Sequence, residues 1–171
     1  MIPPRLESAR LRIRVLAASD AAFICELLNT PGFLKFIGDR GVRSDAEARA
    51  YIDNGPRASY LRHGFGLMAV ERLSDGVPVG ICGLLKRDTL EHADLGFAFL
   101  PAHMGQGFAF ESALRVLQWG RDAAGLSEVL AIVSAHNGAS IGLLRKLNFG
   151  FLRREIVVPG ADEVEVYGCR L

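Results

Sequence analysis

Two glycines one residue apart, Gly105 and Gly107, occur in the stretch PAHMGQGFAFES (residues 101–112), between a predicted strand and a predicted helix. The first turn of a helix has backbone N–H groups without partners and lies at the positive end of the helix dipole, which suits a phosphate group. Glycines at this position allow left-handed backbone angles and let an anion approach without a Cβ in its way. The stretch therefore predicts either a tight turn or a phosphate-binding loop, and a lone GxG pattern favours the turn.

Two common nucleotide-binding patterns do not fit this stretch. A Walker loop requires a GK(S/T) ending, whereas Gly107 is followed by Phe108 and Ala109. The GxGxxG pattern of dinucleotide-binding proteins requires a glycine at position 110, which is Phe, and it normally follows the first strand. Both departures disfavour a P-loop nucleotide-binding protein and a dinucleotide-binding protein.

The bulk composition limits the classes of protein that this chain can represent. Its 171 residues suit one domain, 1–171, and its 50% hydrophobic and 23% charged residues are typical of a soluble globular protein. A net charge of +1, with no run of Lys or Arg, argues against a nucleic-acid partner. No apolar run approaches the roughly 20 residues of a membrane span, and no secretory signal is evident. We therefore expect a cytoplasmic protein without a membrane partner.

The three cysteines, Cys25, Cys82 and Cys169, lie far apart in the sequence. Their spacing, with each other and with histidine, does not suit zinc. An odd number of cysteines without a secretory signal predicts reduced thiols, and no residue beside them suggests a base. The sequence thus predicts neither a metal site nor a catalytic cysteine.

The periodicity of apolar residues and the turn signals predict a mixed α/β (α+β) chain. The predicted strands are 10–16, 66–73, 77–86, 94–100, 129–134, 149–158 and 164–171, and the predicted helices are 21–28, 44–61, 108–124 and 137–147. Ser19-Asp20 and the capping box that begins at Ser44 mark two helix N-termini, and residues 33–43 are a loop or a short helix. A single crossover, from 94–100 to 129–134, must join parallel strands.

Four motifs of this chain occur together and in order in a known enzyme family. Residues 104–109, MGQGFA, correspond to (R/Q)xxGx(G/A), and with Glu111 they fit GxGxAxE. SARLRIRVLAASDA (8–21) is similar to TERLRLRPLxxxDA, DLGFAFLPAHMGQG (94–107) to xEIGYxLxPxxxGxG, and HNGASIGLLRKLNF (136–149) to xNxxSxxxLxKLGF. Together they resemble the GNAT superfamily of N-acetyltransferases, in particular its RimJ/RimL-like branch, which acetylates ribosomal-protein N-termini. The resemblance covers most of the chain and is weakest over 30–64.

The resemblance implies the GNAT fold, with a splayed, mostly antiparallel sheet of about seven strands flanked by about four helices. It also implies acetyl-CoA as the co-substrate, in a slot between strands 94–100 and 129–134, where an N–H of the first strand polarises the thioester carbonyl. The implied contacts are backbone groups of Phe97, Ala98, Phe99 and Leu100 for pantetheine, Met104, Gly105, Gln106, Gly107, Phe108 and Ala109 for the pyrophosphate, and Asn137 and Ser140 near the amide and sulfur end.

The chain departs from the family at positions that carry proton transfer. In related amine acetyltransferases a Glu acts as base where this chain has Ile132, and a Tyr often protonates the departing thiolate where it has Leu144. Met104 replaces the Arg or Gln of the signature, and Asn148 replaces the usual glycine. The resemblance therefore supports the cofactor site more strongly than it supports the acid–base groups.

Two residues are the first candidates for catalysis. Asp94, at the start of a central strand, is the candidate base, acting through water, and its alternative is a surface carboxylate. Ser140 is the candidate proton donor or water-holder near the sulfur. Lesser candidates are Glu155, Tyr167 and His136.

The sequence therefore predicts an acetyl-CoA-dependent N-acetyltransferase that uses direct transfer to an amine, without a covalent enzyme intermediate. The acceptor is a protein N-terminal α-amine or a small-molecule amine, and a homodimer is one assembly open to it. The alternative is a non-catalytic acyl-CoA-binding module, which Ile132 and Leu144 suggest. The aromatic residues Phe33, Phe36, Tyr51 and Tyr60 either shape the acceptor pocket or pack the N-terminal helices on the sheet.

Overall fold

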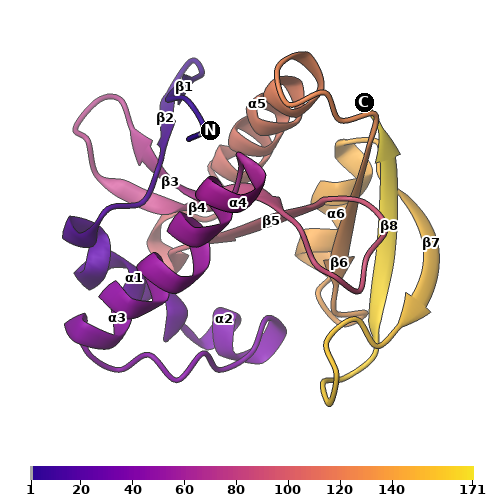
Figure 1. Cartoon of the computed structure of the whole chain (residues 1–171), viewed down its shortest axis with the longest axis horizontal. Helices are drawn as coiled ribbons and strands as arrows, with labels where there is room; N and C mark the ends of the chain where they lie inside the picture. The colour runs from indigo at the N-terminus through magenta and orange to yellow at the C-terminus, as the bar shows by residue number, and fades with distance from the viewer. Residues whose placement is uncertain (1) are drawn as a thin grey trace.

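A central sheet of eight strands organises the molecule, whose computed structural model describes residues 2–171 (Figure 1). The strands are β1 (Leu6–Glu7), β2 (Leu11–Arg14), β3 (Leu67–Arg72), β4 (Pro78–Leu85), β5 (Asp94–Phe99), β6 (Glu128–Val133), β7 (Gly150–Glu155) and β8 (Val164–Arg170). Their order across the sheet is β1-β2-β3-β4-β5-β6-β8-β7, and all neighbours are antiparallel except β5 and β6. The predicted mixed α/β fold is confirmed, and the short β1 adds an eighth strand.

Helices cover both faces of the first half of the sheet. They are α1 (Ala21–Leu28), α2 (Pro31–Phe36), α3 (Asp45–Ile52), α4 (Ala58–His63) and α5 (Phe108–Asp122), whereas α6 (Gly138–Lys146) lies against β6. Successive side chains of a strand point to opposite faces. Val70 of β3 accordingly packs in the cluster that contains α5, whereas Ala69 packs in the cluster that contains α1 and α3.

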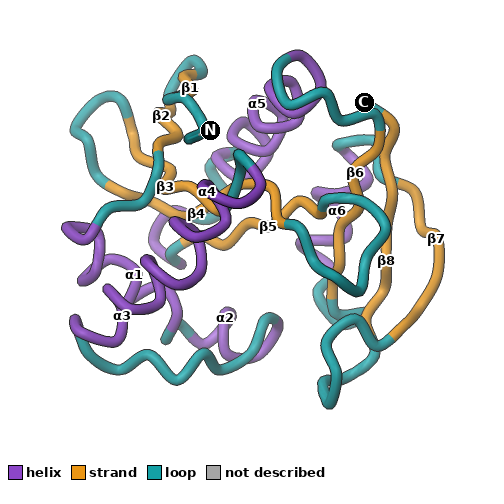
Figure 2. Tube along the Cα trace, viewed as in Figure 1, coloured by secondary structure: helices purple, strands orange, loops and turns teal. Residues whose placement is uncertain are grey.

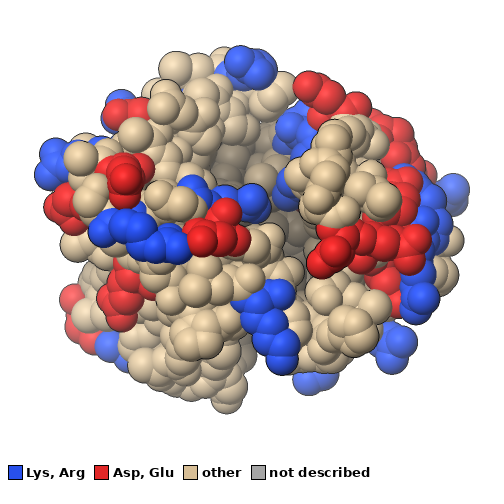
Figure 3. All heavy atoms as spheres, turned by 90° about the horizontal axis from the view of Figure 1, so that it is seen from below, with Lys and Arg blue, Asp and Glu red and all other residues tan. Residues whose placement is uncertain are grey.

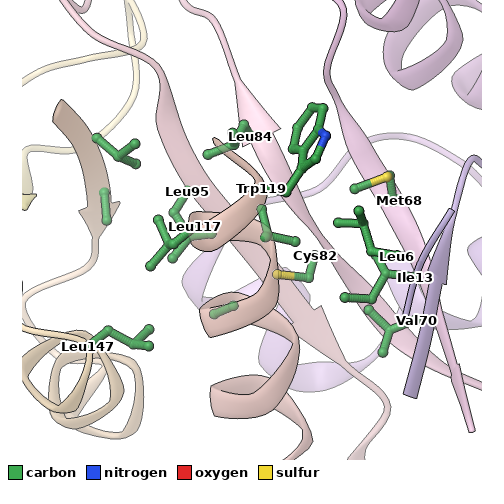
Figure 4. Close-up of a cluster of buried hydrophobic side chains, with 14 of the residues drawn as sticks. Leu6, Ile13, Met68, Val70, Cys82, Leu84, Leu95, Leu117, Trp119 and Leu147 are labelled. Carbon is green, nitrogen blue, oxygen red and sulfur yellow. The ribbon is translucent and has the colours of Figure 1, made fainter. Parts of the chain in front are cut away.

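The larger hydrophobic cluster lies between α5 and the sheet (Figure 4). Leu117 and Trp119 of α5 share it with Cys82 and Leu84 of β4. Burial raises the pKa of the Cys82 thiol to about 12, so this cysteine is a small apolar core residue and not a nucleophile. All three cysteines are free thiols, as predicted.

The predicted helix 44–61 is present but interrupted. Ser44 caps its N-terminus as expected, with its side chain accepting a backbone N–H. A π-helical turn over Asp53–Arg57 separates α3 from α4, because Pro56 has no N–H to donate to the regular helical pattern. The run ends at Gly64, whose φ of 78° is the left-handed conformation that glycine adopts readily.

Asp20 is the N-cap residue of α1, as predicted, but its side chain does not cap that helix. Asp20 instead accepts the Ala17 N–H at 2.8 Å and closes a 3-10 turn over Ala18–Asp20, ahead of α1. Its carboxylate also accepts two hydrogen bonds from Arg14 of β2, each 2.9 Å long. Charged donors satisfy a buried carboxylate better than a single backbone N–H does, so Asp20 ties α1 to the sheet.

Two loops lie at the same end of the molecule in Figure 2, the one between α2 and α3 and the one between β7 and β8. They belong to distant parts of the sequence, 37–44 and 156–163. The sheet brings them to opposite sides of the region where β5 and β6 separate (Figure 1). This end of the molecule carries the candidate site.

Candidate active site

The glycine stretch forms a loop that leaves the N-terminus of α5 without a side-chain cap. Gly105 and Gly107 have φ values of 73° and 82°, in the left-handed region, and Gly107 is the N-cap residue of α5. Within residues 2–171, no acceptor bonds the backbone N–H groups of 105–110, and the first helical bond is that of Glu111 to Gly107. The exposed helix end fits an anion such as a pyrophosphate.

The strands β5 and β6 lie side by side only where they begin. Asp94 and Leu130 are their one registered pair, and the Leu130 N–H donates to the Ala93 carbonyl at 2.9 Å. Beyond that pair the two strands separate (Figure 1), so the edge of β5 that faces β6 is not paired. An unpaired strand edge can bind an extended, amide-containing chain as if it were an added strand.

The backbone groups of β5 point alternately toward this slot and toward β4. The Leu100 N–H donates to a β4 carbonyl, whereas the Ala93 carbonyl binds β6. Successive residues of a strand direct their polar backbone groups to opposite edges. Phe97 and Phe99 therefore present theirs to the slot, while those of Ala98 and Leu100 are used by β4. This alternation narrows the predicted pantetheine contacts within 97–100 to two residues.

A cavity of about 550 Å³ extends across the slot. On the α6 side its walls are Ile132, Ser134, Asn137, Ser140 and Leu144, and on the side of α2, α3 and the β7–β8 loop they are Phe33, Phe36, Ile37, Arg40, Tyr51, Val157, Val158 and Asp162. From below, the surface is hollowed near the middle, with basic and acidic groups on both sides of the hollow (Figure 3). A donor and an acceptor can thus reach one another from opposite sides of the sheet.

Asp94 lies in the wall of this cavity, where the slot begins. Its side chain is 1% exposed, so the alternative of a surface carboxylate is wrong. Both carboxylate oxygens lie 3.1 Å from Nε of Arg87. Burial raises the pKa of Asp94 above its usual range, although the neighbouring guanidinium opposes this shift.

A comparison with Asp20 shows what is unusual about Asp94. Both are buried aspartates that bind an arginine, but burial is outweighed at Asp20, whose pKa is lowered. Asp20 accepts bonds from two guanidinium nitrogens of Arg14 and from a backbone N–H, whereas Asp94 receives a single side-chain N–H group. The less stabilised carboxylate of Asp94 is the better proton acceptor of the two.

Asn137 and Ser140 lie at the start of α6 and line the cavity, as the sequence predicts. The Asn137 side chain caps α6 by accepting the Ser140 N–H at 3.3 Å. In the part of the chain that the structure describes, the Ser140 hydroxyl makes no hydrogen bond, so it is free for a ligand or for water. Asn137 therefore holds the helix end in place while Ser140 presents a donor to the cavity.

The lesser catalytic candidates lie outside the cavity walls. Glu155 binds Arg153 at 2.9 Å, and the Tyr167 hydroxyl donates to Glu165 at 3.0 Å. His136 is exposed ahead of α6. The geometry brings none of these three side chains to the slot.

The aromatic cluster divides into two groups. Phe33, Phe36 and Tyr51 line the cavity. Tyr60 is 3% exposed, and its hydroxyl accepts the Leu16 N–H at 3.1 Å and donates to the Leu67 carbonyl. Tyr60 thus packs α4 on the sheet, and only the other three shape the cavity.

Sequence reasoning missed Arg40, Arg87 and the β7–β8 loop as parts of this cavity. In the antiparallel register of β4 and β5, Leu85 lies opposite Asp94. Arg87 follows Leu85 by two residues, in the turn between the two strands, and this pairing brings it to Asp94. A single sequence carries no signal for that pairing, because Arg87 sits in a loop without a motif. Among residues 2–171, no His, Cys, Asp or Glu cluster suits a metal ion. In that same range no helix has the length and apolarity to cross a membrane.

Comparisons with known proteins agree with this geometry. Residues 10–150 match the profile of the family described as acetyltransferase (GNAT) domain. The chain is 28% identical over 169 residues to the uncharacterized N-acetyltransferase YoaA of Bacillus subtilis, a match that covers 96% of this chain and 95% of YoaA. Its structure is similar to that of an acetyltransferase from Agrobacterium tumefaciens, with a TM-score of 0.81, 21% identity, and coverage of 99% and 95%. It is also similar to RimL in complex with coenzyme A, with a TM-score of 0.79, 16% identity, and 98% coverage of both chains.

Proposed function

We propose, from the premise that this chain belongs to the acetyltransferase (GNAT) domain family, that it transfers the acetyl group of acetyl-CoA directly to an amine. The observation that carries this proposal is the cavity that extends across the β5–β6 slot, together with the uncapped N-terminus of the helix α5, which follows β5 in the chain. The name of YoaA as an N-acetyltransferase and the coenzyme A bound to RimL support it. The continuous eight-stranded sheet supports one such domain over 1–171.

The cofactor side of the site is assigned to backbone groups. The free N–H groups of 105–109 would receive the pyrophosphate, with Met104 exposed at the edge of the loop. Backbone groups of Phe97 and Phe99 would bind the pantetheine amides along the unpaired edge of β5. Acetyl-CoA, when bound, supplies the thioester carbonyl carbon that the amine attacks. A slot-facing N–H of β5 can polarise that carbonyl.

The acid–base groups are assigned to Asp94 and Ser140. A C–N bond forms as the C–S bond breaks, so the amine loses a proton and the thiolate gains one. Asp94, through water, would accept the proton of the amine, because burial favours its protonated form. Ser140 would hold water, or donate, beside the departing sulfur. The apolar side chains of Ile132 and Leu144 in the cavity wall leave these two residues as the candidates.

The acceptor is proposed to be a protein N-terminal α-amine or a small-molecule amine. It would enter between α2 and the β7–β8 loop, where Phe36, Tyr51 and Val158 form apolar walls. The fold likeness to RimL supports the RimJ/RimL-like branch. The cytoplasm as the location, and a homodimer as the assembly, remain proposals from the sequence.

The test is CoA release from acetyl-CoA, measured with a thiol reagent, in the presence of a panel of peptides and small amines. We expect release that depends on the amine, with the acetylated amine identified by mass spectrometry. Tight acetyl-CoA binding without any amine-dependent release would instead favour the non-catalytic acyl-CoA-binding module. A thermal shift by CoA, and none by ATP with magnesium, excludes the nucleotide-binding alternative, since ligand at about 100 times its Kd adds roughly 2.7 kcal/mol.

A further inference from the structure

Arg10, in the turn between β1 and β2, lies against the glycine loop although nearly a hundred residues separate them. Its Nη1 donates to the Gln106 carbonyl at 2.9 Å, and its guanidinium carbon lies 4.7 Å from the centre of the Phe108 ring. Its Nη2 is 3.2 Å from the position that a Cβ on Gly107 would take. One side chain therefore contacts three consecutive residues of the loop.

Arg10 also engages the acidic residue that follows the loop. Glu111 accepts the Arg10 backbone N–H at 2.8 Å, the Arg10 Nε at 2.7 Å and the Ser8 hydroxyl at 2.8 Å. Burial acts to raise the pKa of Glu111, but these bonds outweigh it and hold the pKa below its usual range. Glu111 is thus a charged carboxylate whose oxygens are held by Ser8 and Arg10.

A charged Glu111 presents a difficulty for an anion site. It lies in the first turn of α5, the same helix end that presents free N–H groups. A carboxylate there suits the helix dipole, but it repels a second anion at that end. An arginine bound to it cancels that charge where the pyrophosphate would lie.

We infer that Arg10, together with Ser8, is a positioning residue for the cofactor: it neutralises Glu111 and fixes the loop so that its N–H groups stay free for the pyrophosphate. This inference rests on the proposed acetyl-CoA site. It gives the β1–β2 turn a part in cofactor affinity, and it links the N-terminal motif to the glycine motif by direct contact.

Arg115 offers a matched control on the same helix. Its Nε donates to the Glu7 carbonyl at 3.1 Å, so it too joins α5 to the β1–β2 segment. Arg115 lies one helical turn after Glu111 and shares a surface pocket with it and with Gly107, but among residues 2–171 its side chain makes no hydrogen bond or ion pair with either of them. Removing Arg115 deletes the same charge and a similar connection, without touching the loop.

The experiment measures the Kd of CoA by calorimetry, without an amine, for wild type, Arg10→Ala, Arg115→Ala, Glu111→Gln and the double variant Arg10→Ala/Glu111→Gln. We expect Arg10→Ala to raise the Kd roughly tenfold or more, because charge-assisted bonds are lost and Glu111 is left uncompensated. Arg115→Ala should stay within about twofold of wild type. In the Arg10→Ala background, Glu111→Gln should lower the Kd of CoA at least about threefold relative to Arg10→Ala alone, because it removes the uncompensated charge.

The rescue separates positioning from simple support of the fold. If Arg10 only joins β1–β2 to α5, the double variant binds CoA no better than Arg10→Ala, and that result overturns the inference. Equal Kd values for Arg10→Ala and wild type overturn it as well, as does an equal loss in Arg115→Ala. A wild type that binds CoA yet acetylates no amine refutes the proposed function alone, whereas a wild type that binds no CoA refutes both.

Discussion

The two halves of the proposed active site are built in different ways. The proposed cofactor half uses backbone groups from one stretch of chain, 94–109, in which the strand edge that lines the cavity leads into the glycine loop. The proposed acceptor half uses side chains from three distant segments, represented by Phe36 of α2, Arg87 after β4 and Asp162 in the β7–β8 loop. The first half comes from one continuous segment of the chain, whereas the second is assembled from segments that are distant in the sequence.

This difference decides which substitutions each half tolerates. The proposed recognition by backbone groups requires particular φ angles, so it would constrain Gly105 and Gly107 but accept an exposed methionine at position 104. Side-chain recognition depends on the size and charge of each wall residue. We therefore expect changes in the loop to act on the cofactor, and changes in the acceptor walls to act on the amine.

The largest effect should come from Gly107→Glu. The change places a carboxylate at the proposed phosphate site and forces a side chain into a φ of 82°. The Kd of CoA, measured by calorimetry, should rise by roughly 100-fold or more. Gly125→Glu is the matched control, since Gly125 has a φ of 69° and open space around it. An unchanged CoA affinity in Gly107→Glu would reject the phosphate loop.

The contrast between the halves also explains what the sequence could predict. The glycine loop, its flanking strand and helix, and Asn137 and Ser140 at the start of α6 all follow from local patterns, and the structure brings Asn137 and Ser140 to the same cavity as β5. The splay of β5 from β6 was implied by family resemblance and not by periodicity. Neighbouring residues determine the loop, the elements that flank it and the start of α6, so a single sequence contains the signal for these features.

The failures share one physical cause, which is contact between distant segments. Asp20 reads as a helix cap from its neighbours, but Arg14 of β2 binds its carboxylate. Tyr60 and Phe36 are equivalent candidates by type, yet the sheet buries one and leaves the other on the cavity. Arg87 meets Asp94 only through the β4–β5 register. Local propensity contains no information on such pairs.

Asp94→Asn tests the chemistry at the boundary between the halves. We expect kcat to fall about 100-fold with little change in the Kd of CoA, because the proposed proton acceptor is lost. Since burial raises the pKa of Asp94, the wild-type rate should fall as pH decreases through that raised pKa, and the variant should lack this acid limb. The measurement is kcat against pH with a saturating amine.

The matched control for Asp94 is Asp20→Asn. It also removes a buried carboxylate from an arginine pair, but it lies away from the cavity. The lowered pKa of Asp20 means that its stabilising contribution is present at neutral pH and is lost as pH falls through the folded-state pKa. This control should therefore lower Tm and leave the acid limb of kcat intact. An acid limb that persists in Asp94→Asn rejects Asp94 as the base.

Ser140→Ala should have a smaller effect, limited to the chemical step. Its hydroxyl is free in the cavity, whereas its backbone N–H maintains the cap of α6, so the variant should fold normally. We expect kcat to fall about tenfold with the Kd of CoA unchanged. Single-turnover acetyl transfer measures the step directly. A Kd that rises as much as kcat falls would assign Ser140 to cofactor binding instead.

The smallest effect should separate the two kinds of aromatic residue. Phe36→Ala removes part of an acceptor wall, so the KM of the amine should rise about fivefold while the KM of acetyl-CoA stays constant. Tyr60→Phe is the counterpart: it leaves the buried Leu16 N–H and Leu67 carbonyl without their partner and should lower stability by about 1–2 kcal/mol, with both KM values unchanged. Steady-state kinetics give the KM of the amine and of acetyl-CoA for each variant, and thermal unfolding gives the stability of each. If Tyr60→Phe shifts the KM of the amine as far as Phe36→Ala does, the acceptor half includes α4. That result would contradict the assignment of the acceptor half to α2, the β4–β5 turn and the β7–β8 loop alone.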